Sequence, residues 1–433
     1  MRILYFTQYY PPEVGATQTR AYEMCRHLVR CGHRVTVITE VPNHPSGIIP
    51  PAYRGRLSER RLEEGIDVLR LWVWASPEKT FGSRMRFYLS YMAMAALAGA
   101  LVREPGGGGG RYNLVYATSP PLFVGLAGLA AATARRVPFV FEVRDLWPES
   151  AVALGELADR RAIALAEGLE RLLYRRAKRI VAVTSGIRDR LVQRGIPEGK
   201  LALIPNGANT DLFRFDPDGR QRVRAQWGVH EDEDQFVAMY AGVHGLAQGL
   251  ETVLQAASML KDRPHIRFVF VGEGPRKAGL VDMSRRMGLS NVRFLPEVPA
   301  HQMPAYLSAA DCTIVPLRDQ PVFRGALPSK MFEAWACARP VVLSAAGEAV
   351  GVLNEAGGGI AVPPERPDEL ARAILHLAEH ADEAGRMGLL GCEYVRRNYS
   401  RQEQASRLEA LLRSLMDEHQ PEPERRPTCI YSI

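Results

Sequence analysis

Short apolar runs of four to seven residues recur along this chain, and most are followed by a longer segment with helical periodicity. The first two runs are residues 2–7 and 35–39, and a helix is predicted between them, near 18–31. Strand, helix and strand in this order and length predict a parallel βαβ unit. The same rhythm returns in the second half, at 236–241 and 266–271. With 433 residues, the chain is long enough for two α/β domains with separate cores.

Composition narrows the class of protein only a little. The chain is 46% hydrophobic with a net charge of +7, which suits anionic partners without choosing among nucleic acid, lipid headgroups and phosphorylated substrates. Its six cysteines form no C-x-x-C pair, so neither a zinc framework nor a set of disulfides is predicted. We therefore expect the protein to lie in a reducing cytoplasm. The strand-like start at residues 1–6 is broken by Thr7-Gln8, which predicts no signal peptide.

The segment 324–351 has the features of a phosphate and nucleoside site. Ser329 can act as an N-cap for a helix ending near Arg339-Pro340, before a short buried strand at 341–344. A helix N-terminus has unpaired N–H groups and a positive dipole end, so it suits a phosphate. Lys330 would add a full charge beside these donors.

Glu333 lies one turn further along this helix, where its carboxylate could take both hydroxyl groups of a ribose. The small residues 344–347 would let backbone approach a sugar closely. An ordinary α/β helix with a capping serine and a solvated lysine explains the same residues, since fold elements do not imply function. Gly15-Ala16, between the first strand and its helix, could also bring N–H groups to an anion, but the turn lacks a full G-x-G-x-x-G fingerprint.

The block P-S-K-x-F-E-x-x-A-x-x-x-P-V, followed by G-E-A, resembles the nucleotide-sugar site of family four glycosyltransferases. Other blocks of that family recur in order over nearly the whole chain, and the most similar branch makes bacterial O-antigen, capsule or colanic-acid-type polysaccharides. The resemblance implies the GT-B fold, in which two Rossmann-like domains face a cleft. It implies a donor site made by these residues: Gly15, Ala16, Leu295, Pro296, Ser329, Lys330, Glu333, Gly347 and Glu348.

The loop after the run 236–241 departs from the family pattern. Relatives often have an arginine and a lysine there that touch the donor phosphates, and this chain has Val243 and Gln248. Lys330 is then the remaining cation, and His244-Gly245 could supply a side-chain or backbone donor, although a histidine is equally plausible as a loop residue.

Arg144-Asp145 follows the predicted strand 137–143, at the end where open α/β sheets place functional groups. The family usually has His-Asp there, so the resemblance implies that Arg144 and Asp145 take part in catalysis together with Lys330. A structural ion pair between Arg144 and Asp145 explains the same two residues.

The resemblance also implies a division of the chain. Residues 1–205 are expected to form the acceptor-side domain, and 206–387 the nucleotide-sugar-binding domain. A helix within 388–418 is expected to cross back to the first domain. The Pro- and charge-rich residues 419–433 are expected to be disordered.

Residues 87–102 form the most hydrophobic segment, flanked by Arg84, Arg86 and Arg103. It is shorter than the roughly 20 residues that span a bilayer, and a core helix is the simpler interpretation. The alternative is a helix that dips into a membrane surface through Phe87, Tyr88, Tyr91 and Met92. Two basic stretches could support such a contact: a loop with Arg54, Arg56, Arg60 and Arg61, and a run with Arg171, Arg175, Arg176, Lys178 and Arg179.

The resemblance thus implies a hexosyl- or N-acetylaminosugar transferase that moves a sugar from a nucleoside diphosphate, UDP above all, to a hydroxyl group with retention. It implies a polyprenyl-diphosphate-linked acceptor and a peripheral position on the inner, anionic face of the cytoplasmic membrane, with no nucleic-acid partner. No Asp-x-Asp pair is placed at a strand end, so no cofactor or divalent metal is expected. Two alternatives remain: an epimerase or hydrolase on the same fold, and a non-catalytic subunit that binds a sugar nucleotide.

Overall fold

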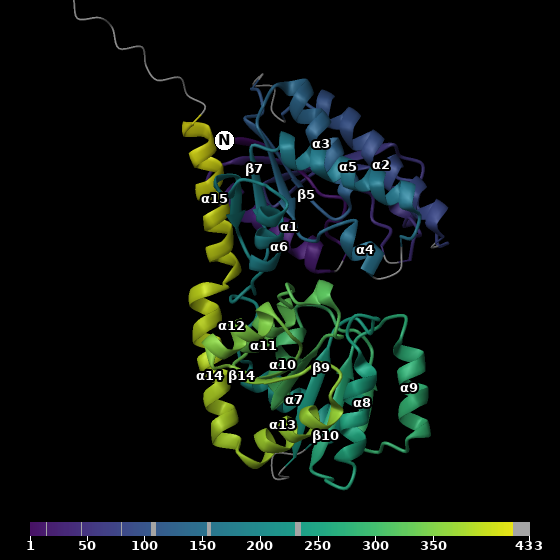
Figure 1. Cartoon of the computed structure of the whole chain (residues 1–433), viewed down its shortest axis with the longest axis vertical. Coiled ribbons are helices and arrows are strands. Elements are labelled where there is room, and N and C mark those ends of the chain that lie inside the picture. The colour runs from purple at the N-terminus through teal and green to yellow at the C-terminus, as the bar shows by residue number, and fades with distance from the viewer. Residues whose placement is uncertain are drawn as a thin grey trace, which may run out of the picture.

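The computed structural model of the chain describes residues 1–13, 15–44, 46–78, 80–104, 110–153, 157–229 and 235–418. These residues form two β-sheets, each with helices on both faces, stacked along the long axis of the molecule (Figure 1). This arrangement confirms the predicted α/β class with two Rossmann-like domains. The tail expected to be disordered lies outside the described residues.

The first sheet has the strand order β3-β4-β2-β1-β5-β6-β7-β8, and all its neighbours are parallel except β3 and β4. Its strands are β1 (Arg2–Phe6), β2 (Arg34–Glu40), β3 (Ser58–Glu63), β4 (Ile66–Leu71), β5 (Leu114–Thr118), β6 (Phe139–Val143), β7 (Arg179–Ala182) and β8 (Leu201–Leu203). Its helices are α1 (Ala16–Arg30), α2 (Phe81–Leu101), α3 (Leu122–Arg135), α4 (Glu149–Ala153), α5 (Arg160–Arg176) and α6 (Ser185–Gln193), with short 3-10 turns at Pro51–Tyr53 and Glu198–Lys200.

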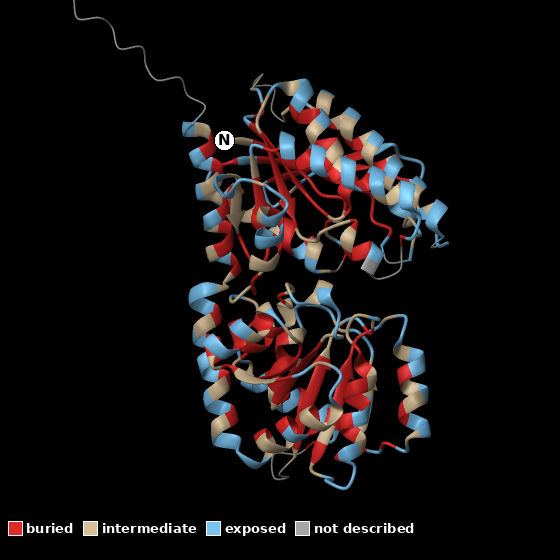
Figure 2. Ribbon diagram, viewed as in Figure 1, coloured by how far each residue is buried: buried red, intermediate tan, exposed pale blue. Residues whose placement is uncertain are grey.

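Alternating side chains of β1 supply a core to each face of this sheet. Leu4 and Phe6 pack with residues of α2, α3 and α5, and Ile3 and Tyr5 pack with residues of α1 and the C-terminal helix. The central strands are therefore buried on both faces, and Figure 2 shows them in red, whereas the edge strand β3 is largely exposed.

The apolar segment predicted at 87–102 is part of α2, which begins earlier because Thr80 accepts a hydrogen bond from the Ser83 backbone N–H. Tyr91 is fully buried, and its hydroxyl donates to the carbonyls of Thr7 and Ile38. Tyr91 is therefore a core residue, and its predicted contact with a membrane is wrong. None of the helices among the described residues is long and apolar enough to cross a bilayer.

The basic loop predicted around residues 54–61 is in part a strand. Arg60 and Arg61 lie in β3, which forms an antiparallel hairpin with β4. Arg60 pairs with Asp67 at 2.7 Å, and Arg61 pairs with Glu59. These pairs neutralise two of the four arginines that were expected to face an anionic surface.

The second sheet is wholly parallel, with the order β11-β10-β9-β12-β13-β14. Its strands are β9 (Phe236–Ala241), β10 (Ile266–Val271), β11 (Val292–Leu295), β12 (Cys312–Pro316), β13 (Val341–Ser344) and β14 (Gly359–Val362). Its helices are α7 (Pro217–Trp227), α8 (Leu250–Met259), α9 (Lys277–Arg286), α10 (Met303–Ala309), α11 (Ser329–Ala336), α12 (Glu348–Ala356) and α13 (Pro367–Glu379), with a 3-10 turn at Pro321–Phe323. The strand order reverses between β9 and β12, the place where ligands bind in open α/β sheets.

Two helices end the described chain, where one crossing helix was expected. In Figure 1, α14 (Ala381–Asn398) lies against the second sheet's helices, and α15 (Arg401–Asp417) continues along the first domain. Beside the break, Ala208 pairs with Ser400, and the buried Arg401 guanidinium donates to the Gly207 carbonyl. The chain thus passes between the two domains twice, near residue 207 and near residue 400, and the two passages lie side by side. This supports our proposal to divide the chain near residue 206.

Candidate active site

The head of α11 lies at the carboxyl edge of the second sheet, next to its switch point. Pro328 occupies the N-cap position and no side chain caps the helix, so the predicted capping role of Ser329 is wrong. Ser329 is already the first helical residue, and a proline side chain has no acceptor to offer. The first turn of α11 therefore has no side-chain acceptor for its N–H groups.

Lys330 crosses the end of β9 on its way to the cleft. A Cβ atom on Gly242 would lie 2.2 Å from the lysine Cε, so only glycine, here with φ 135°, leaves room for this side chain. The lysine Nζ lies 5.9 Å from the centre of the Tyr240 ring. Among the described residues it has no ion-pair partner, and burial lowers the pKa of Lys330, opposed by Glu333.

Glu333 lies one turn further along the same helix, as predicted. Its carboxylate has no hydrogen-bond or ion-pair partner among the described residues. Burial raises the pKa of Glu333, while the positive charges of Arg401 and Lys330 oppose the rise. A half-buried carboxylate without a partner is costly, and this cost is what a ligand with two hydroxyl groups would relieve.

The loops after β9 and β10 are joined through their backbones. His244 N–H donates to the Glu273 carbonyl at 2.8 Å, and Arg276 N–H donates to the His244 carbonyl. The His244 ring is fully buried against Tyr240, Phe270 and Phe294, and neither ring nitrogen has a hydrogen-bond partner among the described residues. In this structure the backbone N–H of His244 is therefore engaged and its ring is enclosed.

Leu295 and Pro296 follow the edge strand β11, where the resemblance places the nucleobase. The Leu295 carbonyl already accepts hydrogen bonds from Lys277 Nζ at 2.9 Å and from Gly272 N–H at 3.3 Å. Pro296 has no N–H to donate. A nucleobase N–H that bound the Leu295 carbonyl would compete with these two donors for the same oxygen. The contact of the base with Leu295 and Pro296 therefore stays a proposal.

Gly15 is the N-cap of α1, on the other side of the cleft. The first turn of α1 has no acidic residue, and a Cβ atom on Gly15 would lie 2.4 Å from the Gln18 Oε1 atom. The helix has fifteen residues, begins at Ala16 and has no acidic side chain in its first turn. The free N–H groups of that first turn can therefore bind an anion.

Arg144 and Asp145 follow β6, but no ion pair joins them in the described part of the chain. Asp145 accepts a hydrogen bond from the Ser150 hydroxyl at 2.8 Å. Arg144 instead faces the buried ion pair of Arg20 and Glu142, and burial lowers the pKa of Arg144 to about 10. Its Nη1 atom is buried without a partner. The structural alternative, an Arg144–Asp145 ion pair, is therefore wrong.

Glu348 reaches across the cleft in this structure. Its two carboxylate oxygens accept hydrogen bonds from the backbone N–H groups of Ser185 at 2.8 Å and Gly186 at 2.7 Å, at the start of α6. Gly347 leaves no space for a Cβ atom because the Arg324 carbonyl would lie 2.0 Å away. Glu348 thus bridges the two domains, and a contact with a donor sugar would require this bridge to break.

Replacing Glu348 by alanine should therefore speed amide hydrogen exchange at Ser185 and Gly186. Loss of a capping acceptor costs about 1 kcal/mol, or roughly fivefold in protection. Exchange measured by NMR or mass spectrometry checks this, with Asn354→Ala, on an exposed position of the same helix, as the control. Equal exchange in both variants and the unmodified protein would show that the bridge contributes nothing in solution.

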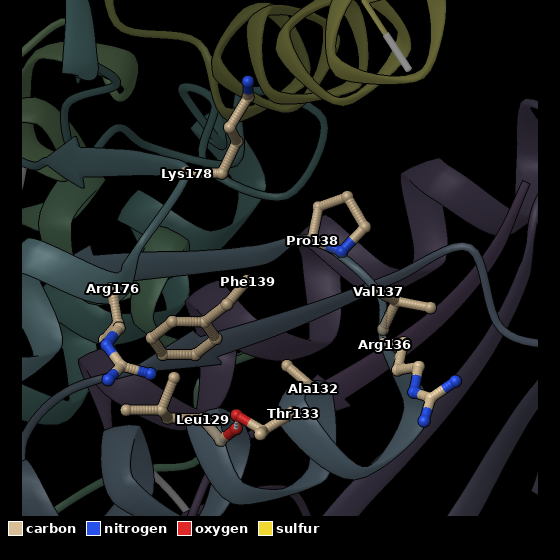
Figure 3. A pocket seen from close by; sticks show the side chains of 9 residues that line it. All are labelled: Leu129, Ala132, Thr133, Arg136, Val137, Pro138, Phe139, Arg176 and Lys178. Carbon is tan, nitrogen blue, oxygen red and sulfur yellow. Dashed lines mark hydrogen bonds between the residues drawn. The ribbon is translucent and has the colours of Figure 1, made fainter. Parts of the chain in front are cut away.

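Two cavities lie at the amino ends of the strands, on the far side of each sheet from the proposed active site. One of about 250 Å³, shown in Figure 3, is lined by Phe139 at the start of β6 and by Arg136, Arg176 and Lys178. The other, of about 440 Å³, lies at the start of β9, where Arg220 and Arg224 bind Asp311 and backbone carbonyls. Because ligands of open α/β sheets bind at the carboxyl edge, we place the active site at the cleft.

Sequence reasoning missed the residues whose role depends on distant partners. Gly242 is needed by a lysine 88 positions later, and Arg20 joins Glu142 to the carbonyls of Ile204 and Pro205. The sequence had one signal for these contacts: Gly242 directly follows the apolar run 236–241, where a glycine often allows a close approach.

Comparisons with known proteins agree with this geometry. The family model "Glycosyl transferase 4-like domain" matches residues 15–207, and "Glycosyl transferases group 1" matches residues 222–389. A putative colanic acid biosynthesis glycosyl transferase, WcaI of Escherichia coli, is 26% identical over 86% of this chain and 91% of its own length. A probable glycosyltransferase, WbjE of Pseudomonas aeruginosa, is 25% identical over 65% of this chain and 69% of its own.

Solved structures share the fold. A sucrose-phosphate synthase from Thermosynechococcus elongatus aligns with a TM-score of 0.72 at 21% identity, over 96% of this chain and 99% of its own. Anabaena HepE in complex with UDP-glucose aligns with a TM-score of 0.71 at 18% identity, over 96% of this chain and 100% of its own. The two Rossmann-like sheets, the two matched domains and these relatives lead to one conclusion: the chain belongs to the glycosyltransferases of GT-B fold, with a glycosyl transferase 4-like domain followed by a group 1 domain.

Proposed function

We propose that this glycosyltransferase moves a sugar from a UDP-sugar to a hydroxyl group of a lipid-linked acceptor, with retention, in the synthesis of a cell-surface polysaccharide. The observation that carries the proposal is the pair Lys330 and Glu333 on one face of α11, beside the switch point of the second sheet. Among the described residues, neither side chain has a hydrogen-bond or ion-pair partner. The related fold of HepE in complex with UDP-glucose supports the choice of donor, and the similarity to WcaI supports the pathway.

In this proposal the donor diphosphate lies at the head of α11. The helix N–H groups from Ser329 onward and the Lys330 ammonium stabilise the negative charge that grows on the diphosphate as the glycosidic bond breaks. The head of α1 at Gly15 faces the same charge, and Gly245 offers a further backbone donor. Glu333 accepts hydrogen bonds from the two ribose hydroxyl groups.

The acceptor hydroxyl group lies on the first domain in this proposal, near Asp145 and Arg144 at the end of β6. Burial raises the pKa of Asp145. A raised pKa makes this carboxylate a better acceptor for a proton at neutral pH. Arg144 precedes it in the chain, and its buried Nη1 atom, without a hydrogen-bond partner among the described residues, is free to meet a polar group of the acceptor in this proposal.

Ligand-detected NMR against a panel of UDP-, GDP- and dTDP-sugars tests the donor assignment. We expect UDP-sugars to bind, and Glu333→Ala to weaken that binding. Preference for GDP-sugars would change the nucleotide, and no binding by any member of the panel would overturn the proposal.

In this proposal Lys330 and the N-terminus of α11 stabilise the diphosphate charge that a divalent cation would otherwise stabilise. EDTA should therefore leave the turnover number unchanged, and added Mg²⁺ should not raise it. The test compares initial rates of UDP release after exhaustive chelation and after metal is restored. A large loss of rate that Mg²⁺ reverses would contradict this prediction.

We also propose that the enzyme binds the anionic inner face of the cytoplasmic membrane through α2. This helix has four exposed apolar side chains, Phe81, Leu89, Leu97 and Leu101. Exposed arginines lie on the same helix and just after it, at Arg84, Arg86 and Arg103. The neighbouring α5 adds exposed leucines and arginines at Leu165, Arg171, Leu172, Arg175 and Arg176. In Figure 1, α2 and α5 lie on the same side of the first domain.

The protein should therefore co-sediment with vesicles that contain anionic lipid. Each basic residue near such a surface adds about 1 kcal/mol, and high salt weakens this part. Leu97→Asn with Leu101→Asn should reduce binding, whereas Leu389→Asn with Leu390→Asn, exposed leucines of the second domain, should not. A protein that stays in the supernatant with all vesicles would leave α2 as a core helix only.

A further inference from the structure

A third cavity, of about 240 Å³, lies at the cleft edge of the first domain and has no part in the donor site. Its walls come from the segments after β1, β2 and β4 and from the start of α2. Tyr9, Asn43, His44, Glu78, Arg84 and Tyr88 contribute to its lining. The carboxyl ends of parallel strands share one edge, so this cavity faces the same cleft as Asp145.

An aromatic row runs from this cavity toward Asp145. The His44 ring lies 5.4 Å from the Tyr9 ring, and Tyr9 and Tyr88 both line the cavity. Tyr88 stacks on Phe123 at 6.1 Å, and Phe123 lies 6.3 Å from Trp147. These rings follow β2, β1, β5 and β6, so the row crosses the switch point of the first sheet, between β1 and β5.

Three rings of the row differ from the aromatic core of the same domain. Tyr5, Tyr91 and Tyr116 are fully buried and Phe123 is only 8% exposed, but Tyr9, Tyr88 and Trp147 are half-buried. Half-buried rings along a cleft are suited to a ligand with apolar faces and polar edges, because such a ligand packs on a ring and keeps its hydrogen bonds. A pyranose ring has these faces and edges.

The charges in the cavity indicate a neutral ligand. Among the described lining residues, Arg84 and Glu78 contribute one charge of each sign, and the Asn43 and Ser76 side chains add neutral polar groups. A diphosphate would need an excess of cations. Mixed donors and acceptors around aromatic rings instead match the hydroxyl groups of a sugar. The cavity's size, below that of a pocket for a drug-sized ligand, suits one ring.

We propose that this cavity binds a non-reacting sugar of the acceptor, while the sugar that receives the transfer lies against the half-buried Trp147 beside Asp145. The acceptor then carries at least two sugar residues, and an earlier glycosyl transfer must supply it. This inference rests on the proposed function and adds the class of acceptor to it.

Saturation-transfer NMR and kinetics with methyl mono- and disaccharides of glucose, galactose and mannose test the inference, in the presence of UDP or the bound UDP-sugar. We expect at least one disaccharide to be bound, and used with a kcat/KM at least about tenfold above its monosaccharides, with saturation on both rings. Tyr88→Ala should abolish this advantage and leave the donor KM unchanged, whereas Tyr88→Phe should keep most of it. Phe215→Ala, an exposed aromatic residue of the second domain, is the control.

Arg84→Met, at an exposed position, provides a second variant in case Tyr88→Ala does not fold. Equal binding and use of mono- and disaccharides by the unmodified enzyme would overturn the inference, as would displacement of the disaccharide by a sugar-free polyprenyl phosphate. Both results leave donor binding intact. Absence of donor binding would instead overturn the proposed function, so the two failures are distinguishable.

Discussion

Replacing Lys330 by glutamine should lower the turnover number about 10²- to 10³-fold, the effect of removing one preorganised group from a developing negative charge. The donor KM should change much less, because charge on the diphosphate grows as the glycosidic bond breaks and the lysine acts most strongly at that point. Initial rates of UDP release over a range of donor concentrations separate the two parameters. Lys261→Gln, at an exposed position after α8, is the matched control.

The pH dependence gives an independent check on the same residue. Burial lowers the pKa of Lys330, so its positive charge is present at low pH and is lost as the pH rises through this lowered value. The turnover number should therefore fall on the alkaline side at a lower pH than the ordinary pKa of a lysine. In Lys330→Gln this alkaline limb should disappear. Equal kinetics and equal pH profiles in both proteins would leave Lys330 as a residue without a part in catalysis.

Replacing Glu333 by alanine should raise the donor KM about 10- to 150-fold. A hydrogen bond to a charged group contributes about 1.5–3 kcal/mol, and each 1.4 kcal/mol is a factor of ten. The effect should fall on KM, because the ribose is held equally before and during the reaction. Glu379→Ala, at an exposed helix end, is the control for removing a glutamate.

A donor without the ribose 2′-hydroxyl group makes this test specific. The unmodified enzyme should bind 2′-deoxy-UDP-sugar more weakly than UDP-sugar, and Glu333→Ala should bind both alike, because the two changes remove the same contact. An unchanged donor KM in a folded Glu333→Ala protein would move the nucleoside site elsewhere in the cleft.

The fold could be predicted from sequence because its signals are local. Strands such as Val341–Ser344 are apolar on both faces, and helices such as α11 and α15 have good helix formers between clear ends. Lys330 and Glu333 could be placed on one face of α11 because a helix repeats every 3.6 residues. The repeating order of strands and helices then predicts two sheets of mainly parallel strands, whereas the antiparallel pair of β3 and β4 has no such signal.

The errors arise where a residue's partner lies far along the chain. Arg60 and Arg61 were placed in a loop because they are charged, but their pairs with Asp67 and Glu59 let them lie in a strand. Tyr91 was placed at a membrane because its neighbours are apolar, although its hydroxyl group binds the carbonyls of Thr7 and Ile38. Local patterns contain no information about such contacts.

The site shows the same limit. Glu348 was placed at the donor from its motif alone, and in the structure its carboxylate caps a helix of the other domain, 162 residues away along the chain. Arg144 lies beside Asp145 in sequence but faces the ion pair of Arg20 and Glu142. A motif predicts which side chains gather at an edge of a sheet, whereas their partners follow from how the two domains pack.

The most direct test of the central claim is the stoichiometry of the reaction with the bound UDP-sugar and lipid-linked acceptors from the source membranes. Mass spectrometry can count the nucleoside diphosphate that is released and the sugar that is attached to the acceptor. We predict one UDP for each sugar transferred, with the anomeric configuration of the donor retained in the product. Free sugar equal to the UDP released, an epimerised nucleotide sugar without UDP release, or binding without any turnover would contradict the account.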